Sequence, residues 1–600
     1  MCGFTGAISL NSIDRKNVQE ANGIIDCRGP DAKCNVEKKL KSFNINFWFN
    51  RLSILDLSNE ANQPMYSKEF KTMIMFNGEI FNHIELRREL SQKGLNFYTS
   101  HSDTETILVG LSYFGIEFVN KLRGQFAIVF LDEKNSKLYF IRDRLGQKPL
   151  YYYFDKENIY FGSSLLSVLK ISKKYDIDEI QLFNYLNYGI ISSPNTIFKN
   201  IYKLKPSEII KIDLQNDDFI TTKSNYWNIE NFIDNKPFNV EDFHNLFSEA
   251  VNLRISADVP VANFLSGGLD STSIVKKLVD NGRSVNSFSV YFQDKKYDES
   301  IFINQVVNKY NLNHNFSTIS KKIDIKDIDQ ALNSMDEPYS DPSVLPSFII
   351  SNQIGKHFKV AISGDGGDEL LGGYERTMQS IDRSNLFSNL ISKTYNFYPP
   401  FLGTGNRLLS KSNNLEIKYR SFLEDKKLLN LLKVNSSEYS FADGLNYEDD
   451  NYYKKLLAAD YKYFLPEMMM YKIDRTSMAN SLEVRSPFVD HKLIEYVIST
   501  DNSYFNPSNS KEILKTYLSN DFSNQFLSRK KQGFVFNVEK WVFDNLNLIN
   551  ENISNGYVLN NLNKNIINLL SINKSRINGQ RIWKIFVLEN YLIRTLSKSL

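Results

Sequence analysis

Short apolar runs, rich in β-branched and aromatic residues and separated by polar turn signals, recur from residue 1 to about residue 160. They include FTGAISL, KTMIMFNGEI, GQFAIVFLDE, KLYFIRD and PLYYYF. Runs of this kind are typical of strands. Helix-like segments interrupt them: HIELRRELSQKG, which has a glycine placed to end it, and then TETILVGLSYFG. The pattern therefore predicts a sheet-rich first domain that also carries helices.

The pattern changes further along the chain. Residues 200–240 are polar and asparagine-rich with no sustained period, and from about residue 241 strand-like runs alternate with amphipathic segments of helix length. That alternation is typical of an α/β domain. A chain of 600 residues is also too long for one hydrophobic core. We therefore expect a first domain over residues 2–205, a linker over 206–240 and an α/β domain over 241–600.

Composition and charge narrow the class of protein. Lysine plus arginine exceed aspartate plus glutamate by only three, and no long basic run appears, which argues against a nucleic-acid or membrane-surface partner. Cys2, Cys27 and Cys34 all lie near the N-terminus without CxxC spacing, which argues against a disulfide-rich fold or a zinc ribbon. No signal-peptide pattern is present, and no stretch approaches the roughly 18 apolar residues that span a bilayer. We expect a cytoplasmic protein.

The second domain opens with a motif that fits an anion. An apolar run over residues 259–265 leads into SGGLDS at residues 266–271, and an amphipathic helix follows. Paired glycines let a backbone approach a ligand closely, and N–H groups at the start of a helix point at an anion. The motif lacks the GxxxxGK[ST] and GxGxxG patterns and instead resembles that of the ATP-pyrophosphatases, which split ATP between its α and β phosphates. The alternative is a glycine turn before a helix, capped by Asp270 or Ser271.

A second glycine-rich acidic stretch, SGDGGDE at residues 363–369, again follows a β-branched run. Acidic and hydroxyl side chains on one loop crowd like charges together, which is costly unless a cation lies between them. Mg²⁺ that bridges phosphate oxygens supplies that charge. We therefore predict Asp270 and Asp368 as magnesium ligands, and the alternative is an exposed acidic turn.

Cys2 directly follows the initiator methionine. A methionine before a small residue is of the kind that aminopeptidases remove, which leaves a thiol and a free α-amino group on one residue. That amine has an ordinary pKa of about 8, so its neutral form can accept the thiol proton. Cys2 is therefore a candidate nucleophile that carries its own base, and the alternative is an accident of composition.

Further motifs accompany Cys2 in a fixed order. They are CGFTGAI, CRGPDA, NRLSILDLSNEANQPM, FNGEIFNHIELRREL, HSDTETIL, LRGQFAIVFLD and IRDRLGQKPLYYY. In this order they resemble the glutamine amidotransferases of the N-terminal-nucleophile (class II) type. Joined to SGGLDS, the whole chain resembles the glutamine-hydrolysing asparagine synthetases, from residue 2 to GQRIWKIFVLENYLI near the end. The resemblance implies an α+β N-terminal-nucleophile (Ntn) sandwich followed by an α/β domain of the ATP-pyrophosphatase type, which is adenine nucleotide α hydrolase-like.

The resemblance implies a chemistry for the first domain. The cysteine that matches Cys2 attacks the side-chain amide of glutamine. Donors that match the Asn77 side chain and the Gly78 backbone hold the oxyanion, a contribution that is usually the largest in acyl transfer. The alternative for the Asn77-Gly78 pair is a hairpin turn.

Charged residues would hold the two ends of glutamine. Arg51 matches the arginine whose fork binds the α-carboxylate, and Glu79 and Asp103 match carboxylates that receive the α-ammonium. The predicted glutamine-binding residues are therefore Arg51, Asn77, Gly78, Glu79 and Asp103. A surface arginine and a helix cap are the respective alternatives for Arg51 and Asp103.

In the second domain the resemblance assigns SGGLDS to pyrophosphate and the run SFSVYF to the strand beside adenine. The predicted ATP- and pyrophosphate-binding residues are Leu265, Ser266, Gly267, Gly268, Leu269, Asp270, Ser271, Val290, Ser363, Gly364 and Asp365. Lys531 in RKKQGF matches a family lysine that stabilises the charged species during adenylation and amide formation. Its alternative is a solvated Lys530-Lys531 pair.

These assignments imply a glutamine-hydrolysing asparagine synthase. Ammonia from glutamine amidates aspartate through β-aspartyl-AMP, ATP and Mg²⁺ take part, and a dry passage joins the two sites. A homodimer is common among such proteins. The alternatives are amidation of another carboxylate, such as a sugar uronate in surface polysaccharide biosynthesis, a glutaminase-coupled transferase that shares only the first domain, and a protein with dead sites. The SGGLDS and SGDGGDE loops argue against the transferase, which needs no ATP cleavage, and the intact site residues argue against the protein with dead sites.

Overall fold

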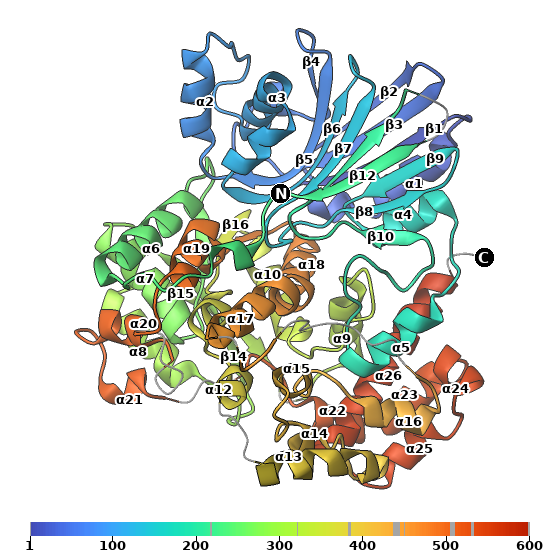
Figure 1. The fold of residues 1–600 in the computed structure, drawn as a ribbon, viewed down its shortest axis with the longest axis vertical. Coiled ribbons are helices and arrows are strands. Elements are labelled where there is room, and N and C mark those ends of the chain that lie inside the picture. The colour runs from blue at the N-terminus through green and yellow to red at the C-terminus, as the bar shows by residue number, and fades with distance from the viewer. Residues whose placement is uncertain are drawn as a thin grey trace.

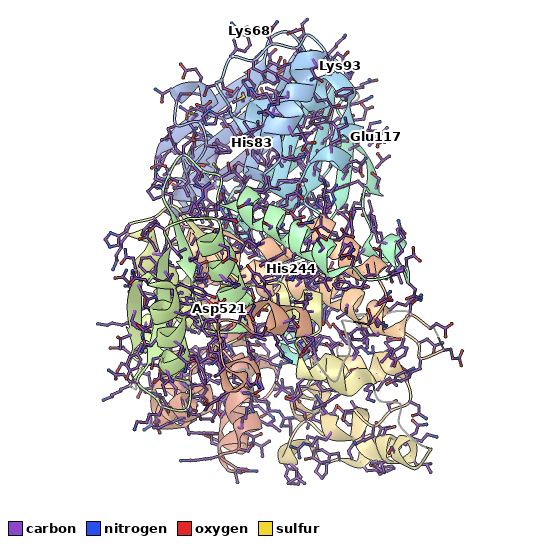
Figure 2. All side chains as sticks on the ribbon, turned by 90° about the vertical axis from the view of Figure 1, so that its left-hand side faces the viewer. Lys68, His83, Lys93, Glu117, His244 and Asp521 are labelled. Carbon is purple, nitrogen blue, oxygen red and sulfur yellow. The ribbon has the colours of Figure 1, made fainter. Side chains whose placement is uncertain are left out.

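The computed structural model describes residues 2–215, 219–320, 322–381, 386–435, 445–448, 450–503, 510–529 and 533–597. The chain forms two parts that lie one above the other (Figure 1). The upper part, drawn mostly in blue, holds the antiparallel sheets, and the lower part holds a parallel sheet and most of the helices. A view turned by 90° places His83 in the upper part and His244 in the lower part (Figure 2). Across the described residues, no helix is both long enough and apolar enough to cross a membrane.

Two antiparallel sheets form the first part, with the strand orders β10-β8-β9-β1-β3-β2 and β12-β11-β7-β6-β5-β4. The strands of one sheet are β1 (Gly3–Ser9), β2 (Ala32–Leu40), β3 (Phe43–Arg51), β8 (Tyr151–Phe154), β9 (Asn158–Gly162) and β10 (Ile201–Lys203). Those of the other sheet are β4 (Met65–Ser67), β5 (Thr72–Ile80), β6 (Gly124–Asp132), β7 (Lys137–Arg142), β11 (Glu208–Asp213) and β12 (Ile220–Asn225).

Helices cover the outer faces of these sheets, so the first part has four layers. α1 (Arg15–Gly23) and α4 (Leu165–Ser172) pack on β1 and β9, while α3 (Asp103–Phe114) packs on β5 with α2 (His83–Gln92) beside it. A shared apolar core between the sheets includes Phe4, Phe47, Met75, Val129 and Phe140. Strands that are buried on both faces read as continuous apolar runs, and β1 is buried along its whole length. This layering is that of the α+β sandwich expected from the sequence.

Residues 206–240, predicted as a linker, differ from that expectation. β11 pairs with β7 and β12 pairs with β11, so the second sheet continues to Asn225. All of β12 is exposed, because it lies at the sheet edge, where polar side chains protect a strand from further pairing. It therefore shows no apolar pattern. The junction between the two parts falls after Asn225, where the short helix Ile229–Phe232 precedes α6 (Val240–Arg254).

A parallel sheet lies at the centre of the second part, with the order β15-β14-β13-β16-β17. Its strands are β13 (Val261–Phe264), β14 (Asn286–Phe292), β15 (Asn313–Ile319), β16 (Val360–Ile362) and β17 (Glu483–Arg485). The chain runs outward from β13 to β14 and β15 and then returns to β16 on the other side of β13. The winding direction therefore reverses between β13 and β16. In open α/β sheets, ligands bind at this switch point, beyond the carboxyl ends of the strands.

Helices connect these strands and build the C-terminal region. Before β16 they are α7 (Leu269–Asp280), α8 (Ser300–Tyr310), α9 (Ile325–Asn333) and α10 (Val344–Gly355). Between β16 and β17 they are α11 (Gly367–Leu371), α12 (Glu375–Ile381), α13 (Leu386–Lys393), α14 (Asn406–Leu409), α15 (Leu415–Arg420), α16 (Lys426–Leu432), α17 (Tyr452–Ala459) and α18 (Tyr471–Met478). After β17 they are α19 (His491–Ser499), α20 (Glu512–Leu518), α21 (Asn524–Leu527), α22 (Val538–Asp544), α23 (Leu546–Ile553), α24 (Tyr557–Asn561), α25 (Ile566–Ser571) and α26 (Arg576–Leu596).

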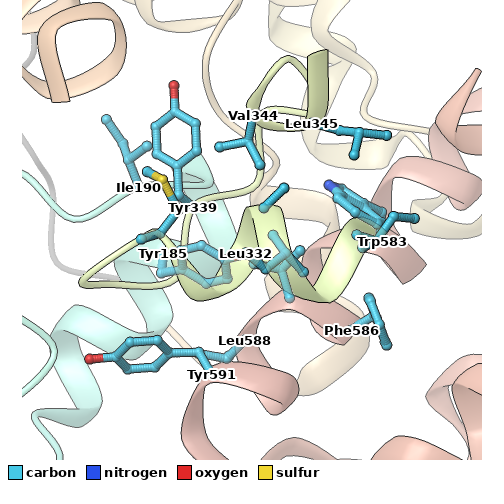
Figure 3. Close-up of a cluster of buried hydrophobic side chains, with 14 of the residues drawn as sticks. Tyr185, Ile190, Leu332, Tyr339, Val344, Leu345, Trp583, Phe586, Leu588 and Tyr591 are labelled. Carbon is cyan, nitrogen blue, oxygen red and sulfur yellow. The ribbon is translucent and has the colours of Figure 1, made fainter. Parts of the chain in front are cut away.

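An apolar cluster joins the two parts. α5 (Glu179–Tyr188) follows the first sheets in the chain, yet its Tyr185 lies with Leu332 of α9 and Trp583 of α26 (Figure 3). The Tyr185 hydroxyl also donates a hydrogen bond to the Lys584 carbonyl oxygen at 3.0 Å. Burial of each such side chain stabilises the contact by about 1.5–3 kcal/mol. A shared hydrophobic core therefore holds the two sheet systems together.

Candidate active site

Cys2 lies directly before β1 and is buried, with 7% of its surface exposed. It lines a pocket together with residues from β5, the loop after β3 and the start of α3. The lining residues are Cys2, Arg51, Leu52, Ile54, Leu55, Ala61, Gln63, Phe76, Gly78, Glu79, Ser102, Asp103 and Thr104. The Cys2 Sγ lies 4.0 Å from the Leu52 carbonyl oxygen. Burial raises the pKa of the Cys2 thiol, so the thiol stays protonated at neutral pH until a base removes its proton.

Asn77 and Gly78 lie inside β5 and not in a hairpin turn. The Asn77 Oδ1 accepts a hydrogen bond from the Cys2 backbone nitrogen at 3.1 Å. The Asn77 Nδ2 is buried and has no hydrogen-bond partner among the described residues, an arrangement that costs free energy in a protein interior. At Gly78, a Cβ atom would lie 2.0 Å from the Gln125 carbonyl oxygen on β6. An unpaired amide donor is therefore held on the rigid strand β5, beside Cys2.

Arg51 ends β3 and is buried, so it is not a surface arginine. Its Nη1 donates to the Ser58 carbonyl oxygen at 2.7 Å and to Asn62 Oδ1 at 2.9 Å. Its Nη2 donates to the carbonyl oxygens of Leu55 and Asp56. The guanidinium thus holds the following loop against the pocket. A carboxylate that binds Arg51 has to share or replace these acceptors.

The two carboxyl groups predicted to receive an ammonium have different partners. Glu79 Oε2 lies 3.1 Å from Arg485 Nη2 on β17, in the second part of the chain. Asp103 Oδ2 accepts a hydrogen bond from the Ile80 backbone nitrogen at 3.1 Å, and Ser102 takes the N-cap position of α3. Burial raises the pKa of both carboxyl groups, and strongly so for Glu79. A cationic group beside them lowers the free energy of their charged forms.

The SGGLDS motif forms the loop from β13 to α7. Gly267 has a φ of +68°, and a Cβ atom there would lie 3.0 Å from the Ile303 backbone nitrogen, so glycine is required for two reasons. The Ser266 and Ser271 Oγ atoms lie 3.1 Å apart, and Ser266 Oγ also accepts from the Gly268 nitrogen at 3.3 Å. Gly268 is the N-cap of α7. The first N–H groups of α7 therefore face the end of the sheet, where an anion binds favourably.

The second loop follows β16, on the other side of the switch point, and meets the first loop. A Cβ atom at Gly364 would lie 3.0 Å from Asp270 Cβ. The Asp270 and Asp368 carboxylates converge on one ammonium, because Lys511 Nζ lies 2.5 Å from Asp270 Oδ2 and 2.6 Å from Asp368 Oδ1. Two carboxylates around one cation position fit Mg²⁺, which binds through one or two carboxylates and completes its shell with phosphate oxygens and water.

The remaining predicted nucleotide residues line the same end of the sheet. Val290 is buried in β14, the neighbour of β13. The Ser363 nitrogen donates to the Arg485 carbonyl oxygen at 3.0 Å, which anchors the start of the second loop. Asp365 is half-buried in that loop. Lys531 lies outside the described residues, and its predicted role stays a prediction.

Lys511 and Arg529 are site residues that the sequence analysis missed. Lys511 is separated from Asp270 by 241 positions and stands in an asparagine- and serine-rich stretch with no motif. Arg529 Nη2 lies 4.0 Å from the position of a Cβ atom at Gly268, and its Nη1 bonds Glu299 Oε1 at 3.0 Å. Arg529 belongs to the basic RKKQGF run, from which the sequence analysis selected only Lys531, so the run indicated the correct segment of the chain.

A buried cluster of charged side chains connects the Cys2 backbone to the second part of the chain. Arg28 Nε donates to the Cys2 carbonyl oxygen at 3.2 Å, and its two Nη atoms donate to Asp474 of α18 at 2.8 and 3.0 Å. Lys148 Nζ lies 3.7 Å from the same carboxylate. Burial opposes ionisation of Asp474, but Arg28 and Lys148 outweigh it and hold the pKa of its carboxyl well below its usual range. The position of Cys2 therefore depends on both parts of the chain.

Comparisons with known proteins agree with this division. The family model described as asparagine synthase matches residues 242–578, and the one described as glutamine amidotransferase domain matches residues 1–227. The chain is 28% identical to asparagine synthetase (glutamine-hydrolyzing) 1 of Bacillus subtilis, over 98% of this chain and 96% of that protein. It is 33% identical to putative asparagine synthetase (glutamine-hydrolyzing) 2 of Methanocaldococcus jannaschii, over 62% of this chain and 76% of that protein. The predicted fold classes of both parts are confirmed.

Proposed function

Because the chain belongs to the asparagine synthase family, we propose that it makes asparagine from aspartate, glutamine and ATP through a β-aspartyl-AMP intermediate. Its family also makes it a glutamine-dependent ligase. The observation that carries the proposal is the convergence of Asp270 and Asp368 on one cation position at the switch point of the sheet. Phosphoryl chemistry at that point is what an adenylating ligase requires.

In the first half-reaction, the Cys2 Sγ attacks the side-chain amide carbon of glutamine. The thiol proton passes to a base, and the Cys2 nitrogen becomes that base as a free α-amine once Met1 is removed. Its hydrogen bond to Asn77 Oδ1 fixes its direction. The unpaired Asn77 Nδ2 then donates to the oxyanion. Ammonia leaves with the proton, and water hydrolyses the thioester to glutamate and free thiol.

In the second half-reaction, an oxygen of the aspartate β-carboxylate attacks the α-phosphorus of ATP and pyrophosphate leaves. The loop of residues 266–271 and the first N–H groups of α7 support the role of pyrophosphate binding there. Asp270 and Asp368 would hold Mg²⁺, which neutralises phosphate charge when bound. Ammonia then attacks the acyl carbon, and the bond to AMP breaks to give the amide.

An ammonia-driven assay tests this function. The purified protein is incubated with Mg-ATP and ammonium, with or without aspartate, and AMP, pyrophosphate and asparagine are measured together. We expect AMP and asparagine in a one-to-one ratio only when aspartate is present. Glutamate release from glutamine without any aspartate-dependent AMP would refute aspartate as the acceptor, and a panel of uronate sugars would then identify another carboxylate.

A further inference from the structure

Arg485 reaches from the parallel sheet to Glu79, a carboxylate that lines the glutamine pocket. Its Nη2 lies 3.1 Å from Glu79 Oε2, and Glu79 lines the pocket beside Cys2. Arg485 is fully buried, and Glu79 is 4% exposed. The side chain therefore carries charge from the second part of the chain directly to a group that faces the glutamine site.

The backbone of the same residue holds an ATP loop. Arg485 pairs with Ile362 at the end of β16, and its carbonyl oxygen accepts a hydrogen bond from the Ser363 nitrogen at 3.0 Å. The next residue adds a second contact, because the Ser486 and Ser363 Oγ atoms lie 2.7 Å apart. Ser363 begins the loop that leads to Asp368. A shift at the end of β17 therefore reaches the start of this loop through two hydrogen bonds.

The Arg485 guanidinium also contacts a second carboxylate and two backbone carbonyl oxygens. Its Nε bonds Glu483 Oε1 at 2.5 Å. Its Nη1 donates to the carbonyl oxygens of Arg254 and Ser256 at 3.0 and 2.7 Å, in the segment that leads to β13. One guanidinium thus divides its charge between two buried carboxylates, Glu79 on the glutamine side and Glu483 on its own strand. A cation bound beside Glu79 changes that division.

We propose that Arg485 is a positioning residue that couples occupancy of the glutamine pocket to the conformation of the ATP loop at Ser363. The inference rests on the proposed function, because it places the glutamine ammonium beside Glu79. With that ammonium present, Glu79 holds Arg485 less strongly, and the guanidinium turns toward Glu483 and the carbonyls before β13. The end of β17 and the hydrogen bonds to Ser363 follow this change, so each ligand alters the binding of the other.

Linked titrations on a Cys2→Ala protein test the coupling. This variant cannot hydrolyse glutamine, so calorimetry gives the Kd of glutamine with and without saturating Mg-ATP, and the Kd of Mg-ATP with and without saturating glutamine. We expect each Kd to change by about fivefold or more, by the same factor in both directions, because coupling free energies are reciprocal. A factor of one overturns the coupling while leaving the proposed function intact. Absence of binding by either ligand overturns both.

Second-site variants assign the coupling to Arg485. In the Cys2→Ala background, Arg485→Lys keeps the charge but loses the planar fork, so the factor is expected to fall to about one. Ser486→Ala removes one contact to Ser363 without a buried charge and is expected to lower the factor at least by about half. An unchanged factor in either variant overturns the assignment.

Arg123→Lys is the matched control. Arg123 is also a buried arginine that crosses between the two parts, and its Nε lies 2.8 Å from Asp490 Oδ2. Unlike Glu79, the partner of Arg485, the ion-pair partners of Arg123, Asp490 and Glu249, do not line the glutamine pocket. We expect this variant to keep the full coupling factor. An equal loss in Arg123→Lys and Arg485→Lys overturns the specific role, because the coupling then belongs to the whole interface.

Discussion

Replacement of Asn77 by alanine is expected to separate catalysis from folding. The amide makes one hydrogen bond, to the Cys2 nitrogen at 3.1 Å, which contributes about 1 kcal/mol to stability. Its Nδ2 is buried without a partner among the described residues, which costs about 1–3 kcal/mol. The substitution loses the first contribution and relieves the second cost. We therefore expect the free energy of unfolding to change by less than about 1.5 kcal/mol.

The same change removes a preorganised donor for the oxyanion. Loss of such a donor lowers kcat by about 10²–10³-fold, which is about 3–4 kcal/mol of transition-state stabilisation. Ammonia-driven synthesis uses the other site, so its rate is expected to stay at the wild-type level. Steady-state release of glutamate, the ammonia-driven rate and equilibrium unfolding in urea measure the three quantities on one preparation.

Gln63→Ala supplies the control in the same pocket. Both ends of this amide are bonded within the protein: Nε2 donates to the Phe76 carbonyl oxygen, and Oε1 accepts from the Phe76 nitrogen at 2.6 Å. Its loss is expected to lower the free energy of unfolding by about 1–3 kcal/mol with less than about a tenfold effect on kcat. If Asn77→Ala instead loses more than about 3 kcal/mol of stability while glutamate release falls less than about tenfold, the amide serves folding and the oxyanion role is refuted.

Other changes probe the two sites and the fold. Cys2→Ala is expected to abolish glutamine-dependent synthesis while ammonia-driven synthesis persists, and loss of both rates would contradict separate sites. Asp270→Asn should remove AMP formation yet leave glutamate release, so unchanged AMP formation argues against its role as a metal ligand. Lys511→Met leaves the buried Asp368 and the half-buried Asp270 without a counter-ion, so metal-free protein should lose up to about 3 kcal/mol in urea unfolding, and Mg²⁺ should restore part of it. Equal stability with and without Mg²⁺ contradicts a shared cation position. Burial lowers the pKa of His314 from 6.5 to about 4. Between pH 6.5 and 4 the unfolded chain therefore binds a proton at this histidine that the folded chain does not bind, and the free energy of unfolding should fall as the pH drops through this range. The variant His314→Asn should not show this loss.

Much of the fold and part of the site could be predicted because the signals are local. In residues 259–280, pattern and spacing predict a strand, a glycine loop and a helix that follow one another in the chain. The resemblance that the order of motifs around Cys2 carries implied a sandwich, and the structure brings Arg51, Glu79 and Asp103 together at the pocket beside Cys2. The edge strand β12 could not be predicted, because an exposed strand shows no alternation of apolar and polar residues.

The sequence by itself determined the residue types of both sites, the strand and helix periods and the presence of two domains. Only the tertiary structure decided that Lys511 stands between Asp270 and Asp368, and that Arg485 connects Glu79 to the loop that begins at Ser363. These contacts join positions hundreds of residues apart, and their strength comes from burial, where few water molecules remain to screen or replace a charge. The local sequence pattern does not predict such pairs. The packing of separate elements brings their charges close together and creates the low dielectric that strengthens the electrostatic interaction between them.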